Sequence, residues 1–248
     1  MKKYYLLIFP FFVGIPMTIV AFTGFRSALN EKNTKPCDNV KPKAMNINGH
    51  SYNIYDVSSY DLMLTADRPK TQEISNEFCV PVAFTSKQQT IEGKFIGSGI
   101  DNGSKPNKRT GYAVLNKNKV KFYLTDSINE PALTKEAIAS KGSLFQQDLL
   151  VYRNRIIPTN LFGTARIQCR ALAEMNNGFS IIESATPITI SEFQDALIAL
   201  KVTNAIYNDM GSWSEGWYRA KDNSIVKIGN NHKSTDKQTN WLVAKCRQ

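Results

Sequence analysis

Short stretches of alternating hydrophobic and polar residues follow one another through the middle of the chain. In three places, two such stretches are separated by only a few polar residues, which predicts β-hairpins. The pair around Asn176-Asn177-Gly178 has the strongest signal, because Asn-Gly suits a tight hairpin turn. The predicted strand pairs are 112–116 with 120–125, 149–152 with 155–157, and 169–175 with 179–184.

After the last hairpin, the apolar residues recur with the spacing of a helix instead of a strand. Thr189 can cap a helix, and Glu192, three residues later, completes a capping box. Apolar side chains then recur on one helical face as far as Leu200. A second helix is predicted at residues 134–140, and a short strand at 205–207. Many strands with few helices predict an α+β fold: a single domain with a strand-rich mixed or antiparallel sheet and a few packed helices.

The N-terminal segment has its own pattern. Lys2 and Lys3 precede residues 4–25, which carry no charge. As a helix this stretch would span roughly 33 Å, enough to cross a bilayer core. Residues 1–25 are therefore predicted to be an uncleaved signal-anchor that contacts the membrane. A cleaved signal peptide is the main alternative.

The next residues are polar. Residues 26–44, rich in Asn, Lys and Pro, are predicted to be a tether, and residues 45–248 the globular domain. The positive charge before the apolar stretch favours a domain outside the cytoplasm, either membrane-anchored or secreted.

The composition and charge of the chain limit the kinds of partner that it is expected to bind. The chain has 248 residues and a net charge of +10 that is spread along its length, which favours anionic substrates. No nucleic-acid-binding motif accompanies the charge, so no nucleic-acid partner is predicted. The four cysteines lack zinc-type spacing, and His50 and His232 are far apart, so neither a metal nor a cofactor is predicted. The cysteines permit two disulfides or free thiols.

Candidate chemistry lies in residues 204–214, where an apolar strand ends in an acid. Asp209 can serve as a general base or a nucleophile, and Gly211 allows a ligand to approach the backbone. Ser212 and Ser214 supply hydroxyl groups, and Trp213 and Trp217 supply faces on which a sugar can stack. An ordinary turn, capped by its own aspartate, is the alternative.

Several motifs come in the order of a known family. They are the hairpin strand that begins Cys169-Arg170, the capped helix, the strand that ends in Asp209-Met210-Gly211, and the segments 79–85 and 238–243. Together they resemble the phosphodiester glycosidase domain family, in its exported bacterial subgroup, over roughly residues 45–246. The resemblance implies hydrolysis of an N-acetylglucosamine-1-phosphodiester type of bond on an exported or cell-surface glycoconjugate.

The resemblance also implies roles for single residues. Arg170 would bind the phosphate, as a guanidinium fork matches phosphate oxygens. Asp209 would act at the anomeric centre. The remaining predicted residues would bind the carbohydrate or phosphoglycan substrate: Gly211, Ser212, Trp213, Ser214 and Asn240.

Two other functions stay open at this stage. The same site can hold a glycan without cleaving it, as a binding module at the cell envelope with Trp213 and Trp217 as its platform. Met210, which stands where the family has a second glycine, favours that alternative. A structural role, with Arg170 ion-paired on a flat surface, is the third.

Overall fold

The structure is a computed structural model, and it describes residues 40–176, 178–211, 213–233 and 235–247. These residues all belong to one compact unit, Pro36–Gln248. The predicted signal-anchor at residues 1–25, residues 26–39 of the predicted tether, and Ser212 lie outside the described residues. Within the described ranges, no helix has the length and apolar character needed to span a membrane.

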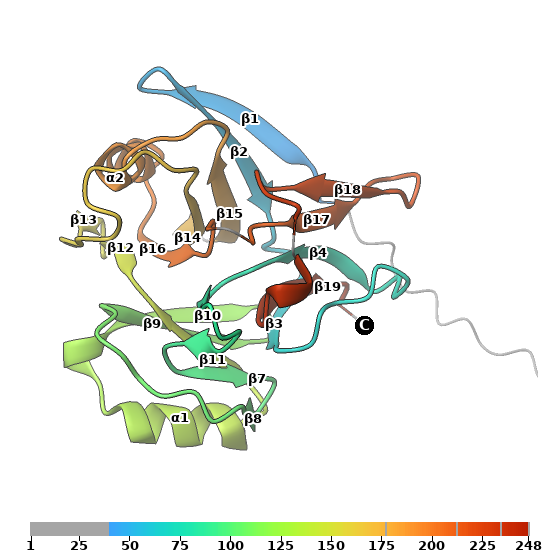
Figure 1. Ribbon diagram of the computed structural model, residues 1–248, viewed down its shortest axis with the longest axis vertical. Helices are drawn as coiled ribbons and strands as arrows, with labels where there is room; N and C mark the ends of the chain where they lie inside the picture. Colours follow the sequence, from blue (N-terminus) through green and yellow to red (C-terminus); the bar gives the residue numbers. More distant parts are fainter. Residues whose placement is uncertain (1–39, 177, 212, 234, 248) are drawn as a thin grey trace, which may run out of the picture. The chain divides into compact units, whose positions relative to one another are not determined.

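Three large β-sheets and one small one form the described unit (Figure 1). The seven-stranded sheet has the order β1 (Pro42–Ile47), β2 (His50–Asp56), β15 (Gly178–Ser184), β14 (Arg170–Met175), β16 (Asn204–Asn208), β12 (Leu149–Tyr152) and β13 (Arg155–Ile156). The first five-stranded sheet has the order β10 (Lys119–Leu124), β9 (Gly111–Asn116), β11 (Ser143–Gln147), β7 (Phe95–Gly97) and β8 (Ile100–Asp101). The second has the order β18 (Ile225–Ile228), β17 (Gly216–Arg219), β4 (Asn76–Val80), β19 (Trp241–Lys245) and β3 (Asp61–Thr65). Strands β5 (Phe84–Thr85) and β6 (Ile91–Glu92) pair with each other.

Every strand pairing among the described residues is antiparallel. The prediction of a strand-rich, antiparallel fold with few helices is therefore confirmed. The three predicted hairpins are present as β9–β10, β12–β13 and β14–β15. In the last of these, Met175 pairs with Gly178, and this register sets every other pair along the two strands.

Two α-helices accompany the sheets: α1 (Glu130–Ala139) and α2 (Ile190–Ala199). The predicted capping box of α2 is present, because the Thr189 hydroxyl accepts from the N–H of Glu192 and the Glu192 carboxylate accepts from the N–H of Thr189. Helix α1 begins earlier than the predicted residues 134–140. Asn129 caps it and Pro131 lies in its first turn, two start signals that the hydrophobic pattern alone does not include. Two short 3-10 turns are also present, Thr125–Ser127 and Thr235–Lys237.

The globular part begins slightly before the predicted boundary at residue 45. Val40 is buried, and β1 begins at Pro42, so residues 42–44 belong to a strand that pairs with β2. The sequence did not predict this strand, because its side chains are mostly exposed and its hydrophobic pattern is weak.

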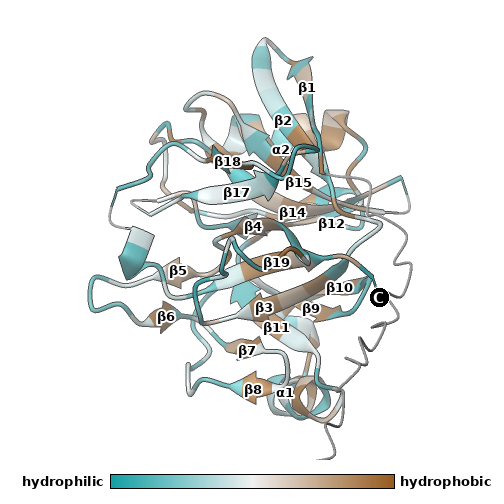
Figure 2. Ribbon diagram, turned by 90° about the vertical axis from the view of Figure 1, so that its right-hand side faces the viewer, coloured by the Kyte–Doolittle hydropathy of each residue, from teal (hydrophilic) through white to brown (hydrophobic). Residues whose placement is uncertain are grey.

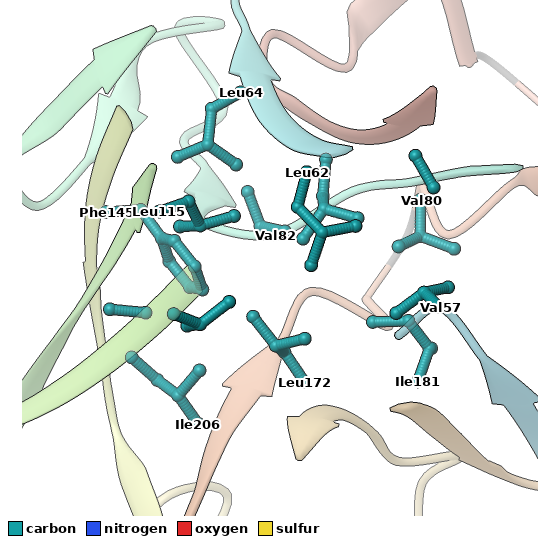
Figure 3. Close-up of a cluster of buried hydrophobic side chains, with 14 of the residues drawn as sticks. Val57, Leu62, Leu64, Val80, Val82, Leu115, Phe145, Leu172, Ile181 and Ile206 are labelled. Carbon is teal, nitrogen blue, oxygen red and sulfur yellow. The ribbon is translucent and has the colours of Figure 1, made fainter. Parts of the chain in front are cut away.

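The largest hydrophobic cluster lies between the sheets (Figure 3). It draws on the seven-stranded sheet through Leu172, Ile181 and Ile206, on the first five-stranded sheet through Leu115 and Phe145, and on the second through Leu62, Leu64 and Val80. Much of the hydrophobic colour in Figure 2 falls on β3 and β19, which line this cluster. A second cluster packs α2 against the other face of the seven-stranded sheet. The sheet that carries the candidate site is thus held on both faces.

Candidate active site

A polar row lies next to an apolar row on one face of the seven-stranded sheet. In the apolar row, Leu172 on β14 pairs with Ile181 on β15 and Ile206 on β16 (Figure 3). Two residues further along the same strands, Arg170 pairs with Glu183 and Asn208. Because side chains alternate along a strand, the polar row faces the same side as the apolar row. The candidate site therefore begins where the hydrophobic core ends.

Arg170 is fully buried in this row. Its Nε and Nη2 donate to Glu183 Oε2 at 2.8 and 2.7 Å. Its other contacts are with backbone carbonyls: Nη1 donates to Asp209 at 3.4 Å and Nη2 to Ser214 at 3.1 Å. The guanidinium thus pairs with an acid inside the protein and fixes the loop that follows β16. Its predicted contact with a phosphate stays a prediction.

Asp209 follows β16 directly and is 4% exposed. Its backbone N–H donates to the carbonyl of Val82 at 2.9 Å, and its Oδ1 accepts from the N–H of Gly211 at 2.9 Å. Burial raises the pKa of this carboxyl to about 7, against the opposing effects of the Gly211 and Thr85 N–H groups and of Arg170. A carboxyl with such a pKa can give up or take up a proton near neutral pH, which suits general acid or base catalysis.

The residues after Asp209 face partly outward. Gly211 is exposed, and a Cβ at this position would lie 3.1 Å from Asp209 Oδ1, so a side chain here would crowd the carboxylate. Trp213 is partly exposed and Met210 is buried in the hydrophobic cluster around α2. Met210 therefore packs into the core.

Ser214, a predicted substrate-binding residue, is buried. Its hydroxyl donates to Asn230 Oδ1 at 2.5 Å and accepts from the N–H of Asn231 at 3.1 Å. Gly229 packs closely enough that a Cβ there would meet the Ser214 carbonyl oxygen at 2.2 Å. Ser214 thus joins the loop after β18 to Arg170, and a sugar hydroxyl would have to replace one of these bonds.

Asn240, another predicted substrate-binding residue, is also buried. Its Oδ1 accepts from the N–H groups of Val82 and Ala83, at 3.3 and 2.7 Å. Its Nδ2 donates to the Ala83 carbonyl at 2.9 Å and lies 3.4 Å from Thr85 Oγ1. The side chain therefore holds residues 82–85 in place, and these residues in turn contact Asp209.

The second predicted stacking residue, Trp217, is placed differently from the expectation. It is only 5% exposed and packs with Cys79 and Trp241. The expectation that Trp217 offers a face to a sugar is therefore wrong, because strand β17 turns this side chain inward. Cys79 and Cys169 are free and buried, so they do not form a disulfide.

An aromatic group lies beside Asp209 that the sequence did not indicate. The ring of Phe84 is 5.7 Å from that of Tyr207 and 5.9 Å from that of Phe162. The guanidinium of Arg109 lies over Phe84, 4.6 Å from the ring centroid. Within the described ranges, no group of three or more His, Cys, Asp or Glu side chains has an arrangement that could hold a metal ion.

Comparison with known proteins supports the fold. No protein-family model matches the sequence, and no curated protein does. Among solved structures, the catalytic domain of zebrafish N-acetylglucosamine-1-phosphodiester alpha-N-acetylglucosaminidase, auto-inhibited by its pro-peptide, is similar with a TM-score of 0.59 at 11% identity, over 85% of this chain and 83% of that one. A hypothetical protein from Synechocystis has a TM-score of 0.59 at 12% identity, over 83% of this chain but only 61% of that one. At such identities these likenesses show a distant fold relationship. The chain therefore shares its fold with these two structures.

Glu183, the partner of Arg170, is a residue that sequence reasoning missed. The signal was present, because a two-residue turn between Met175 and Gly178 places Arg170 opposite Glu183. No comparable signal exists for Arg109 and Phe84, since they come from separate loops and strands that meet only in the folded chain.

Proposed function

We propose that the protein is a hydrolase that cleaves a sugar-1-phosphodiester, of the N-acetylglucosamine-1-phosphodiester type, with Asp209 as the proton-transferring group. One observation carries the proposal: the carboxyl of Asp209 is buried at the end of β16 with its pKa raised to about 7. The likeness in fold to the zebrafish glycosidase supports the choice of reaction.

The reaction consumes one water molecule. The water oxygen bonds to the anomeric carbon as the bond between that carbon and the phosphate oxygen breaks, and a free sugar and a phosphate monoester leave. As a carboxylate, Asp209 takes a proton from the water; as a carboxylic acid, it gives one to the leaving oxygen. The N–H groups of Gly211 and Thr85 donate to the carboxylate and hold it in place. In this scheme Arg170 is a positioning residue, because it holds the carbonyls of Asp209 and Ser214.

The test is sugar release from N-acetylglucosamine-1-phosphodiesters, including a nucleotide sugar, by the full-length protein. We expect Asp209→Asn to lower turnover by about a hundredfold or more, with the fold retained. Asp195→Asn is the matched control, since Asp195 is exposed on α2, and its turnover should equal that of the wild type. Unchanged turnover in Asp209→Asn would remove Asp209 from the chemistry.

The pH dependence assigns the role of Asp209. If it acts as a base, turnover rises as the pH increases through about 7; if it acts as an acid, turnover falls over the same interval. A profile that is flat across this interval contradicts both roles.

A second candidate function is a glycan-binding module without catalysis. The observation in its favour is that Trp213, the predicted platform for a sugar ring, is partly exposed in the loop after Asp209. Binding to a glycan array that survives Asp209→Asn, with no sugar release by the wild type, would support this function over hydrolysis.

A further inference from the structure

A second arginine lies near Asp209 in a different setting. The side chain of Arg109 is 25% exposed, whereas that of Arg170 is fully buried. Its Nη1 donates to Asp148 Oδ2 at 2.8 Å, and its plane rests over the Phe84 ring. Within the described residues, Nε and Nη2 of Arg109 make no hydrogen bond. The guanidinium is thus held in place on one side and has donors to spare on the other.

Two links connect this guanidinium to Asp209. Phe84, which lies beneath Arg109, immediately precedes Thr85, whose N–H favours the ionised form of Asp209. Asp148, the hydrogen-bonded partner of Arg109, accepts at its carbonyl from the N–H of Tyr207, two residues before Asp209, at 2.8 Å. Glu92 Oε2 lies 4.0 Å from Arg109 Nη2. Arg109 and Asp209 therefore border the same region, on either side of residues 84–85.

The two carboxylates near Arg109 differ in how firmly they are held, and the weaker one can be replaced by an incoming anion. Asp148 is buried and hydrogen-bonded to Nη1, so it is a permanent partner. Glu92 is nearly half exposed and too far from Nη2 for a hydrogen bond, so only charge attraction keeps it there. An incoming phosphate can make the hydrogen bonds that Glu92 does not make.

Space for the rest of such a ligand lies on the other side of Arg109. A cavity of about 630 Å³ is lined by Arg109 and Lys108, with Thr125 and Ile157 among its other walls and Asp126 as its one carboxylate. In a sugar-1-phosphodiester the phosphorus is only two bonds from the anomeric carbon. A ligand with its sugar at Asp209 would therefore carry its phosphate toward Arg109 and its remaining group toward the cavity.

We propose that Arg109 is the phosphate-binding residue of this site, and that Glu92 is an internal competitor that the phosphate displaces. The inference rests on the proposed function for the identity of the ligand. It makes two opposite predictions: the loss of Arg109 weakens binding of phosphate-bearing ligands, and the loss of the Glu92 charge strengthens it.

The experiment is calorimetric titration of the full-length protein carrying Asp209→Asn, so that no probe is consumed. The probes are UDP-N-acetylglucosamine and its neutral counterpart, methyl N-acetylglucosaminide. We expect Arg109→Gln to weaken binding of the first by about tenfold to a hundredfold, with the second unchanged. Glu92→Gln should tighten binding of the first. Arg153→Gln is the matched control, since Arg153 also stacks on an aromatic ring, that of Tyr152, at 5.1 Å.

Other results overturn the inference. They are an unchanged affinity in Arg109→Gln, an equal loss for the neutral probe, a weaker affinity in Glu92→Gln, or no binding of UDP-N-acetylglucosamine by the parent protein. Arg109→Lys keeps a positive charge beside Asp148 and replaces Arg109→Gln in the experiment if the latter does not fold. It should bind UDP-N-acetylglucosamine with an affinity between those of the parent protein and Arg109→Gln. Sugar release by the wild type is measured separately. Phosphate binding that depends on Arg109 without sugar release refutes the hydrolase alone, and sugar release with no dependence on Arg109 refutes this inference alone.

Discussion

Arg170 contacts the Asp209 backbone, and Arg109 packs on Phe84, the residue before Thr85, whose N–H contacts Asp209, yet the surroundings of the two arginines differ. Arg170 sits in a sheet row, pairs with Glu183 and holds two carbonyls. Arg109 rests on an aromatic ring at the surface with one firm partner, Asp148. An arginine whose donors are used inside the protein stabilises the structure, whereas one with donors to spare is available to a ligand. The difference assigns a structural role to Arg170 and a ligand-binding role to Arg109.

The largest expected effect comes from Arg170→Ala. The substitution leaves Glu183 as a buried charge without a partner, so we expect the free energy of unfolding to fall by about 3–5 kcal/mol. Urea unfolding followed by circular dichroism measures it. Arg155→Ala, at an exposed position on β13, should change stability by less than about 0.5 kcal/mol.

A double substitution sharpens this result. Arg170→Met with Glu183→Leu removes both charges, so it should regain much of the stability that Arg170→Ala loses. If Arg170→Ala is as stable as the wild type, the ion pair of Arg170 with Glu183 does not stabilise the fold.

The next effect concerns pH. The pKa of Asp209 is raised in the folded protein, so the folded state holds its proton more tightly than the unfolded chain does. Stability is therefore lost as the pH rises from 3.8 to about 7, by up to about 4 kcal/mol. Asp209→Asn has no proton to lose, and its stability relative to the wild type should rise between pH 4 and pH 8. Chemical denaturation at both pH values measures the change, and equal differences at the two would contradict the raised pKa.

The smallest of the three effects is that of Asn240→Ala. It removes the amide that pairs with the backbone of Val82 and Ala83 and leaves those groups buried, at a cost of about 1–3 kcal/mol. It should also loosen residues 82–85 and raise their amide hydrogen exchange. Asn46→Ala, at an exposed position on β1, is the control. Unaltered exchange at 82–85 would show that Asn240 does not hold this segment.

Local signals in the sequence predicted the middle of the fold: three hairpins, helix α2 and the strand before Asp209. The Asn176-Asn177-Gly178 turn predicted the β14–β15 hairpin, and Thr189 with Glu192 predicted the start of α2. Both features depend on residues close together in the chain, where turn and capping chemistry act. Strands outside these regions were not predicted; one of them is β1, whose side chains are mostly exposed and whose hydrophobic pattern is weak.

The candidate site was less predictable. The strand before Asp209 was predicted correctly, but the burial of Asn240 and Trp217 depends on strands that pair across the whole chain. Such long-range packing determines whether a polar side chain is free to bind a ligand or is hydrogen-bonded to the backbone. The same holds for Arg109 and Phe84, which are distant in sequence and adjacent in space.

The contact of Asn240 with residues 82–85 has a consequence for the timing of assembly. During translation, residues 82–85 are made well before Asp209, and Asn240 follows later still. Pairings between such distant segments form slowly, because a long loop must close first. A nascent chain that already contains Asp209 therefore lacks the side chain that fixes the neighbouring segment. The segment beside Asp209 is therefore fixed only after β19 has joined its sheet.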